Sequence, residues 1–459
     1  MKNIIKKYSR REFVRQNSLA GLGAAVALHM TPAMIAGSTT QTNMPAILGG
    51  QSIRTKGWPE WPIWNSETDE EQLINVIRSG VWSRADTVTE FEEKWAETVG
   101  AKRCLATVNG TNALIASLAQ FDIGGGDEVI VPPYTFIATV QAVLMTGAMP
   151  VFVDTDPETF QIDPAKIEAK ITPRTKAILP VHILGLPADM IRIMEIADKH
   201  DLIVVEDACQ SWLAEINHKQ TGTIGNAGCY SFQNSKNLPI GEGGAIVSDD
   251  DEFMDRCYSY HNYGNPYGAV IGEVGAGTAI LGTKLRTTEY QAAIGLSQMK
   301  RLEEQTTLRS QNADYLKSQI STIPGIEPYK LYDEVTRAVF HLFPFRYKKE
   351  EFSDLPRADF LRALRAEGIP ASNGYMPLNK MPYISHALKT KNFQLMYPPE
   401  MLDYNTYMEQ NQCPLNDQLC EEAVWISQSM MLADKSDMDD IAAAIDKIQK
   451  NADKIKNIM

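Results

Sequence analysis

Few features of this chain indicate a membrane, nucleic-acid-binding or metal-binding protein. Its six cysteines are scattered through apolar contexts without the spacing of metal ligands, so we expect buried small side chains and no metal site. Basic residues form no patch, and a net charge of −13 disfavours nucleic acid as a partner. No internal repeat is present. With 44% hydrophobic and 22% charged residues among 459, the composition is that of a soluble globular protein with room for two or three lobes.

The first 40 residues differ from the rest of the chain. Six basic residues stand against Glu12 alone, and an apolar run rich in alanine and glycine follows from Leu19 to Ala36. Paired arginines at positions 10 and 11, one spacer, Phe13 and an aliphatic residue form the pattern of a twin-arginine export signal. An ordinary signal peptide or an uncleaved anchor helix is the alternative interpretation.

We therefore expect residues 1–40 to be a twin-arginine signal peptide that is recognised by the twin-arginine translocation machinery. Cleavage near Ala36 to Thr40 is compatible with the sequence, which has no Ala-x-Ala site there and does not fix the cleavage position. Removal of this segment would change the net charge from −13 to −18. The protein is then expected outside the cytoplasmic membrane, in the periplasm or another extracytoplasmic space. Such a compartment permits disulfides, although the sequence does not pair the cysteines.

Short apolar strands alternate with helical stretches between about residues 100 and 250. The strands are uninterrupted and rich in β-branched residues, as is typical of buried parallel strands. They are expected at 129–131, 150–154, 177–182 and 202–207, with helices between them, as at 111–120 and 188–200. This alternation predicts an α/β fold with a mostly parallel central sheet that is covered on both faces.

Further helices are expected on either side of this region, at 68–79, 87–98 and 288–308. The last of these leads to a smaller lobe with a strand at 339–347 and helices at 358–367 and 438–451. The sequence thus predicts a large domain over 41–300, which includes an N-terminal arm, and a small C-terminal α+β domain over 301–459.

Lys236 and Asp207 are the most informative pair of residues. Lys236 lies in a polar loop before the Gly-Glu-Gly-Gly turn at 241–244, and Asp207 ends an apolar strand. Pyridoxal phosphate requires such a pair, because a lysine amine forms a Schiff base with its aldehyde and a carboxylate keeps its pyridine nitrogen protonated. For one lysine alone, a surface residue beside a surface turn would be the simpler interpretation.

Gly110 and Thr111 open a helix directly after a strand expected at 105–108. A helix N-terminus offers free backbone amides and the positive end of the helix dipole, so it suits a phosphate group. An ordinary N-cap explains the same residue types, and the spacing alone does not decide between the two.

These segments resemble the DegT/DnrJ/StrS family of sugar aminotransferases, which are pyridoxal-phosphate enzymes of fold type I. The family lysine lies in a Ser-Phe-x-x-x-Lys-x-x-x-x-Gly-Glu-Gly-Gly pattern and the family aspartate in Glu-Asp-Ala-x-Gln. This chain matches both patterns, at 231–244 and 206–210. The resemblance runs from about residue 70 to the end and implies pyridoxal 5'-phosphate as cofactor and a homodimer.

The resemblance also implies roles for individual residues. Gly110 and Thr111 would hold the cofactor phosphate, with Ser231 nearby. Phe136 would stack on the pyridine ring and keep one face dry, and Gln210 would contact the side of the phenolic oxygen. Without the family context, Phe136 would be a core residue and the other two would be ordinary polar positions.

The roles of three further residues, Lys284, His182 and Tyr375, are left open by the sequence. Lys284 stands where the family has an asparagine that reaches across the dimer interface to the partner's phosphate; a lysine can bind phosphate as a point charge, so the role is either kept or lost. His182 and Tyr375 are candidates for substrate binding. For His182, a hydrogen-bonded structural histidine at a strand end is nearly as good an interpretation.

The predicted function is the transfer of an amino group from glutamate or glutamine to a keto-sugar or keto-cyclitol by a ping-pong mechanism, with Lys236 moving the proton. The C-terminal motifs look like those of the branch that aminates free keto-cyclitols. Two alternatives are a catalytically silent cofactor-binding sensor or scaffold and a sugar dehydratase. In the dehydratases, histidine replaces the lysine, so the presence of Lys236 favours transamination.

Overall fold

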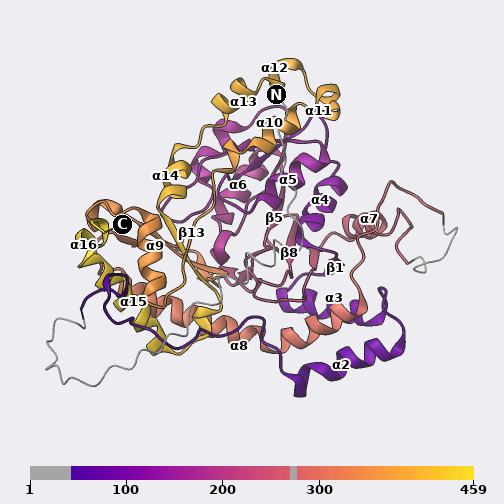
Figure 1. Ribbon diagram of the computed structural model, residues 1–459. Helices are drawn as coiled ribbons and strands as arrows, with labels where there is room; N and C mark the ends of the chain where they lie inside the picture. Colours follow the sequence, from indigo (N-terminus) through magenta and orange to yellow (C-terminus); the bar gives the residue numbers. More distant parts are fainter. Residues whose placement is uncertain (1–42, 269–276, 459) are drawn as a thin grey trace, which may run out of the picture. The chain divides into compact units, whose positions relative to one another are not determined.

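A seven-stranded sheet forms the centre of the computed structural model, which describes residues 43–268 and 277–458 (Figure 1). The strand order is β1-β9-β8-β5-β4-β2-β3, and β9 runs against the other six strands. The strands are β1 (Arg103–Thr107), β2 (Glu128–Val131), β3 (Met149–Phe152), β4 (Thr175–Ile178), β5 (Ile203–Asp207), β8 (Ala227–Ser231) and β9 (Gly244–Ser248). The predicted α/β fold with a mostly parallel sheet is confirmed. The predicted signal peptide lies outside the described residues.

Helices bury both faces of this sheet, because successive side chains of a strand point to opposite faces. Val129 and Val131 of β2 pack in one core cluster with α4, α5 and α7, whereas Ile130 packs in another with α6. On β9, Val247 joins a third cluster that contains α3 and α8. The helices are α2 (Ser66–Ser79), α3 (Asp86–Val99), α4 (Gly110–Gln120), α5 (Ile137–Thr146), α6 (Met190–His200) and α7 (Asp251–His261).

The long helix α8 (Glu289–Ile320) connects the large sheet to a smaller antiparallel sheet of order β10-β12-β14-β13. It starts with a capping box formed by Thr288 and Gln291. The helix continues past the expected end at 308, because its buried face extends through Leu316 to Ile320. The predicted domain boundary between residues 300 and 301 therefore falls inside a continuous helix. The other elements here are β10 (Ile326–Pro328), β12 (Leu342–Tyr347), β13 (Ser372–Asn373), β14 (Ala423–Ser427), α9 (Arg357–Ala366), α15 (Lys435–Gln449) and α16 (Ala452–Lys456).

A helical segment between β13 and β14 leaves the small sheet and packs on the large one. Ile384, Phe393 and Tyr407 of this segment belong to the same core cluster as α4 and α5. Figure 1 shows these helices above the central sheet, beside α5. They are α10 (Pro382–Leu388), α11 (Lys391–Met396), α12 (Pro399–Leu402) and α13 (Tyr404–Gln410), followed by α14 (Pro414–Glu422).

Two expected strands differ from the observed ones. The strand expected at 177–182 ends its ladder at Ile178, although the chain stays beside β5 and forms a bridge between Val181 and Asp207. The strand expected at 339–347 begins only at Leu342, because Phe340 has a φ of 51°, which no regular strand accommodates. A three-stranded sheet of β6 (Glu215–Ile216), β7 (Lys219–Gln220) and β11 (Val335–Arg337) completes the fold. Within the described ranges, every helix is too short or too polar to cross a membrane.

Candidate active site

A cavity of about 480 Å³ lies at the carboxyl ends of the parallel strands, where open α/β sheets bind ligands. It collects residues that follow β1, β2, β5 and β8, together with His341 and Tyr375 from the C-terminal part of the chain. Of the ten predicted site residues, the eight that line it are Gly110, Thr111, Phe136, Asp207, Gln210, Ser231, Lys236 and Tyr375. His182 and Lys284 do not line it.

The N-terminus of α4 forms one wall of the cavity. The first backbone N–H groups of a helix have no intrahelical acceptor. The Asn109 side chain caps one of them by accepting from the Asn112 backbone N–H at 2.8 Å, which leaves the amides of Gly110 and Thr111 free. A Cβ on Gly110 would lie 2.7 Å from the Cys209 Sγ and 2.9 Å from the Ser231 Cβ. Glycine is thus required for the helix end to approach β8 this closely. The arrangement presents two free amides and the Ser231 hydroxyl to one anionic group.

Asp207 is 4% exposed and its carboxylate is held from two directions. The Thr139 hydroxyl donates to Oδ2 at 2.7 Å, and the Cys209 backbone N–H donates to Oδ1 at 3.2 Å. The Thr135 hydroxyl lies 2.8 Å from that of Thr139 and extends the chain of polar groups along α5. The fixed position of the carboxylate is what a partner for a ring nitrogen requires.

Lys236 lies in the hairpin between β8 and β9, and its ammonium is 5.9 Å from the centre of the Trp212 ring. Burial lowers the pKa of this amine, and the negative charge of Asp207 opposes the effect. A lysine with a lowered pKa supplies more of the neutral amine, which is the nucleophilic form. The site therefore combines an activated lysine and a fixed carboxylate across one cavity.

Gln210 and Tyr375 join the two parts of the chain at the cavity. The Gln210 side chain accepts from the Leu184 backbone N–H at 2.8 Å and donates to the Tyr375 hydroxyl at 2.9 Å. Tyr375 stands edge-on to Trp425 and Tyr134, with ring centres 4.4 and 5.4 Å apart. Both side chains are thus held in place before any ligand binds. Phe136, at the entry to α5, is 55% exposed and offers its ring to the cavity.

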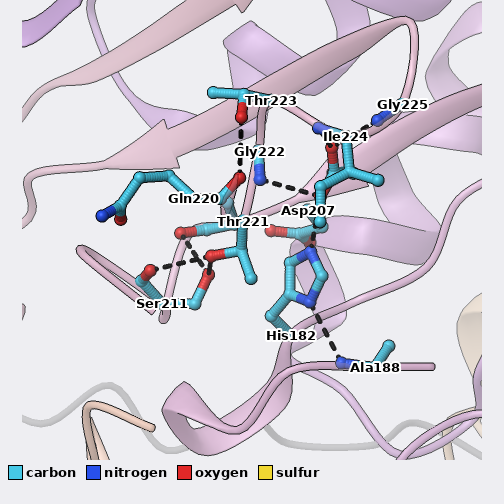
Figure 2. Close-up of polar contacts among 12 residues, drawn as sticks. His182, Ala188, Asp207, Ser211, Gln220, Thr221, Gly222, Thr223, Ile224 and Gly225 are labelled. Atoms are coloured by element: carbon cyan, nitrogen blue, oxygen red, sulfur yellow. Dashed lines mark hydrogen bonds and ion pairs between the residues drawn. The ribbon is translucent and has the colours of Figure 1, made fainter. Parts of the chain in front are cut away.

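His182 has a different environment from the one expected of a substrate-binding residue. It is fully buried, its Nε2 lies 2.9 Å from the Glu206 Oε2, and its Nδ1 accepts from the Ala188 backbone N–H at 3.1 Å (Figure 2). Both ring nitrogens are satisfied away from the cavity. The alternative interpretation of His182, as a hydrogen-bonded structural histidine, fits this geometry.

Lys284 lies on the segment before α8 and pairs its backbone with Asn262. Its side chain is exposed and does not line the cavity of its own chain. The expectation that it reaches a second subunit's phosphate stays a prediction.

The residues that line the cavity and that sequence reasoning missed include Thr139, Glu242 and His341. Thr139 could have been found, because it follows Phe136 by three positions on the expected helix and so shares its face. His341 gave no local signal. Burial and the charges of Lys236 and Arg309 lower its pKa well below the usual range, so it is a neutral imidazole whose Nδ1 lies 3.3 Å from the Asn237 Oδ1.

The residues of this cavity fit pyridoxal phosphate on the geometry alone. The α4 N-terminus suits its phosphate, since the tight packing of Gly110 leaves backbone amides in place of a side chain. Asp207 suits its ring nitrogen, the exposed Phe136 its ring face, and the neutral form of Lys236 its aldehyde.

Comparison with known proteins gives the same result. The model of the DegT/DnrJ/EryC1/StrS aminotransferase family matches residues 65–397. The L-glutamine:2-deoxy-scyllo-inosose aminotransferase of Streptoalloteichus tenebrarius is 31% identical over 420 residues, which cover 88% of this chain and 97% of that protein. The spore coat polysaccharide biosynthesis protein SpsC of Bacillus subtilis is 33% identical over 393 residues, which cover 83% and 95%. The crystal structure of 3-amino-5-hydroxybenzoic acid synthase matches with a TM-score of 0.75 and 29% identity, over 86% of this chain and 99% of that one.

The fold and the lysine-containing cavity define a pyridoxal-phosphate-dependent enzyme of fold type I. The chain belongs to the DegT/DnrJ/EryC1/StrS aminotransferase family. The predicted enzyme class, an aminotransferase, and the predicted cofactor, pyridoxal phosphate, are confirmed.

Proposed function

We propose that this aminotransferase moves the amino group of glutamine or glutamate to the keto group of a free cyclitol or sugar by a ping-pong mechanism. Its relatives support the choice, because several are named L-glutamine:2-deoxy-scyllo-inosose aminotransferases and one acts in spore coat polysaccharide biosynthesis. The observation that carries the proposal is the position of Lys236 and Asp207 on one cavity, beside the free amides of α4.

Each chain residue has a defined task in this proposal. Bound pyridoxal phosphate supplies an aldehyde carbon that exchanges amines and a ring that accepts electrons. Lys236 would hold the cofactor through its Nζ and, as a free neutral amine, would carry the proton during the transfer. Asp207 keeps its charge beside the ring nitrogen. Gly110, Thr111 and Ser231 bind the phosphate.

Gln210 and Phe136 orient the ring by contacts with its edge and its face. Tyr375, fixed by Gln210, faces the space left for the substrate. Leu114 and Val181, which are buried, form an apolar part of the cavity wall. Where water is excluded, the electrostatic attraction between the Asp207 carboxylate and the protonated ring nitrogen is stronger.

A substrate screen tests the proposal. The purified enzyme is first exposed to glutamine or glutamate, which should shift the visible absorbance of the bound cofactor. Free keto-cyclitols, free keto-sugars and nucleotide-linked keto-sugars are then added separately, and recovery of the original spectrum is followed. We expect recovery with free keto compounds. A spectrum that ignores every amino donor contradicts transamination, and a strong preference for nucleotide-linked sugars contradicts the acceptor.

We further propose a homodimer in which Lys284 of one subunit contacts the cofactor phosphate of the other. An exposed apolar group at the end of α2 and in the loop that follows it suits a second copy; Ile77, Val81 and Trp82 are 48%, 52% and 53% exposed. Because Lys236 is the one cation among the described residues of this cavity, a cofactor dianion needs a positive charge from elsewhere.

The Lys284→Ala variant tests this arrangement. We expect weaker cofactor binding that also depends on protein concentration, with Lys219→Ala as the exposed-lysine control. Ultracentrifugation gives the oligomeric state separately. A monomeric protein, or a Lys284→Ala enzyme with unchanged cofactor binding, contradicts the proposed contact.

Export by the twin-arginine route remains our proposal for residues 1–40. The route carries folded proteins, so the cofactor would be inserted in the cytoplasm and leave with the enzyme. This location favours free acceptors, because nucleotide-linked sugars are made inside the cell, and a mature charge of −18 weakly repels a diphosphate. Replacing Arg10 and Arg11 with lysine should retain the protein in the cytoplasm. Unchanged export of that variant contradicts the proposal.

A further inference from the structure

Directly beside Asp207, but on the opposite face of β5, lies the fully buried carboxylate of Glu206. It accepts four hydrogen bonds. Figure 2 labels their donors, His182, Gly222, Ile224 and Gly225. The backbone N–H of Gly222 and the His182 Nε2 reach Oε2 at 2.7 and 2.9 Å. The backbone N–H groups of Ile224 and Gly225 reach Oε1 at 2.6 and 2.7 Å.

These contacts fix the protonation of the pair. The His182 Nδ1 accepts from the Ala188 backbone N–H, so the ring proton is on Nε2, and the ring donates to Glu206. Four donors therefore point at two carboxylate oxygens. A neutral carboxyl group could not accept all four, so Glu206 carries a negative charge that is satisfied entirely by the protein.

The same pair is tied to two residues of the cavity. The His182 backbone N–H donates to the Asp207 carbonyl at 3.1 Å, and the Asp207 backbone N–H donates to the Pro180 carbonyl at 2.9 Å. Together with the side-chain hydrogen bond between His182 and Glu206, these backbone hydrogen bonds hold residues 180–182 against the end of β5. His182 also anchors the turn at Ile183–Gly185, in which Leu184 has a φ of 65° and donates to Gln210.

We propose that Glu206 and His182 are positioning residues, which hold Asp207 and Gln210 against the cofactor from the opposite face of the sheet. The inference rests on the proposed roles of Asp207 and Gln210. Neither Glu206 nor His182 touches the cavity, and both act through the backbone and the turn that they fix. The structure assigns them this role because the network is complete, buried, and joined to both cofactor-binding residues.

The Glu206→Gln variant tests this role, because an amide of the same shape has only one acceptor oxygen, so the donors at the other oxygen, either His182 and Gly222 or Ile224 and Gly225, lose their acceptor. The matched control is Glu367→Gln. Glu367 is also fully buried and accepts two backbone N–H groups, of Ala46 and Ile53 at 2.7 and 2.9 Å, but it lies after α9, away from the cavity. Both variants should lower the melting temperature.

Cofactor readouts separate positioning from general stability. We expect Glu206→Gln to release pyridoxal phosphate from the holoenzyme about 10-fold faster, since the loss of about one hydrogen bond weakens binding by this factor. We also expect a weaker visible circular dichroism signal of the cofactor. Glu367→Gln should keep both near wild type. His182→Leu should behave like Glu206→Gln. His182→Gln retains a donor toward Glu206 and should restore most of the cofactor signal.

The outcomes of these experiments distinguish failure of the positioning role from failure of the proposed role of Asp207. If Glu206→Gln and Glu367→Gln lose stability alike and retain the cofactor alike, or if His182→Gln is as defective as His182→Leu, the positioning role is wrong. If Asp207→Asn also leaves cofactor release and turnover unchanged, the proposed role of Asp207 itself fails. A defect in Asp207→Asn with a normal Glu206→Gln overturns only the present inference.

Discussion

The two sides of the cofactor cavity differ in how well they stabilise a charged side chain. On the Asp207 side, polar groups are satisfied: Thr139 and Cys209 hold the carboxylate, and Glu206 behind it accepts four hydrogen bonds. On the Lys236 side, charge is disfavoured. Burial lowers the pKa of Lys236. Arg309 does not line the cavity, but its charge acts on His341, which does. Burial lowers the pKa of Arg309 to about 9, and its Nη1 and Nη2 have no hydrogen-bond partner among the described residues.

This difference separates groups that must stay fixed from a group that must react. A satisfied carboxylate keeps its charge and position throughout a catalytic cycle. An unpaired, half-buried amine is destabilised as an ammonium and therefore gives up its proton more easily. The contrast predicts that changes on the Asp207 side alter orientation, whereas changes on the Lys236 side alter chemistry and, in the absence of cofactor, stability.

The largest effect is expected for Lys236→Ala, which removes the reactive side of the comparison. The variant should fold, lose the lysine-bound cofactor spectrum, and lose at least about 10³-fold in turnover with glutamine or glutamate. Steady-state kinetics and the visible spectrum measure this. Lys219→Ala, on an exposed strand, serves as the control. Full turnover in Lys236→Ala would falsify the mechanism.

Asp207→Asn should come next, because it keeps the shape of the fixed side but removes its charge. Pyridoxal phosphate should remain bound, while turnover falls by about 10³-fold, since the ring nitrogen loses the anion that keeps it protonated. Single-turnover kinetics on the cofactor-loaded variant measure the step directly. Near-normal rates would remove Asp207 from the site.

Gly110→Ala should weaken cofactor binding about 10-fold and destabilise the fold by about 1–3 kcal/mol. The added Cβ would lie 2.7 Å from the Cys209 Sγ, so the α4 N-terminus must move away from β8. Gly57→Ala is a suitable control, because a Cβ there meets no atom within 4 Å. Cofactor titration and thermal melting compare the two. Equal behaviour of both variants would argue against a phosphate site at α4.

The smallest effect is expected for Lys236→Met in the cofactor-free protein, which should melt about 1–2 °C higher than wild type. The pKa of Lys236 lies below its usual 10.5 in the folded protein, so its ammonium destabilises the fold at pH values below the folded-state pKa. That penalty decreases as the pH rises through the folded-state pKa and disappears above 10.5, where the amine is neutral in both states. Melting curves should therefore converge at alkaline pH. A constant difference across pH would show that packing, and not charge, is responsible.

Short contiguous patterns revealed the parts of the site that each occupy one segment. Lys236, Asp207 and Gly110 each combine a residue type with a local context, such as a strand end or a helix start, and all three line the cavity. His341 could not be found in this way, because it follows a residue with positive φ and reaches the cavity only when the small sheet packs beside the large one.

His182 shows the limit of reading a polar residue at a strand end. Its position was anticipated, but its ring turns away from the cavity toward Glu206. The alternation of side chains along β5 places Glu206 and Asp207 on opposite faces. What the sequence does not state is which face each carboxylate takes and which loop supplies its donors.

The sequence by itself determined the chemistry of this protein: an alternating α/β pattern, a lysine in a Gly-rich hairpin, a carboxylate at a strand end and a helix start for a phosphate. These are local properties, set by neighbours along the chain. The tertiary structure alone decided which groups share one cavity, that α10–α13 return to the large sheet, and that Glu206 is buried with four donors. Burial and hydrogen bonding there depend on segments far apart in sequence, and no local pattern encodes them.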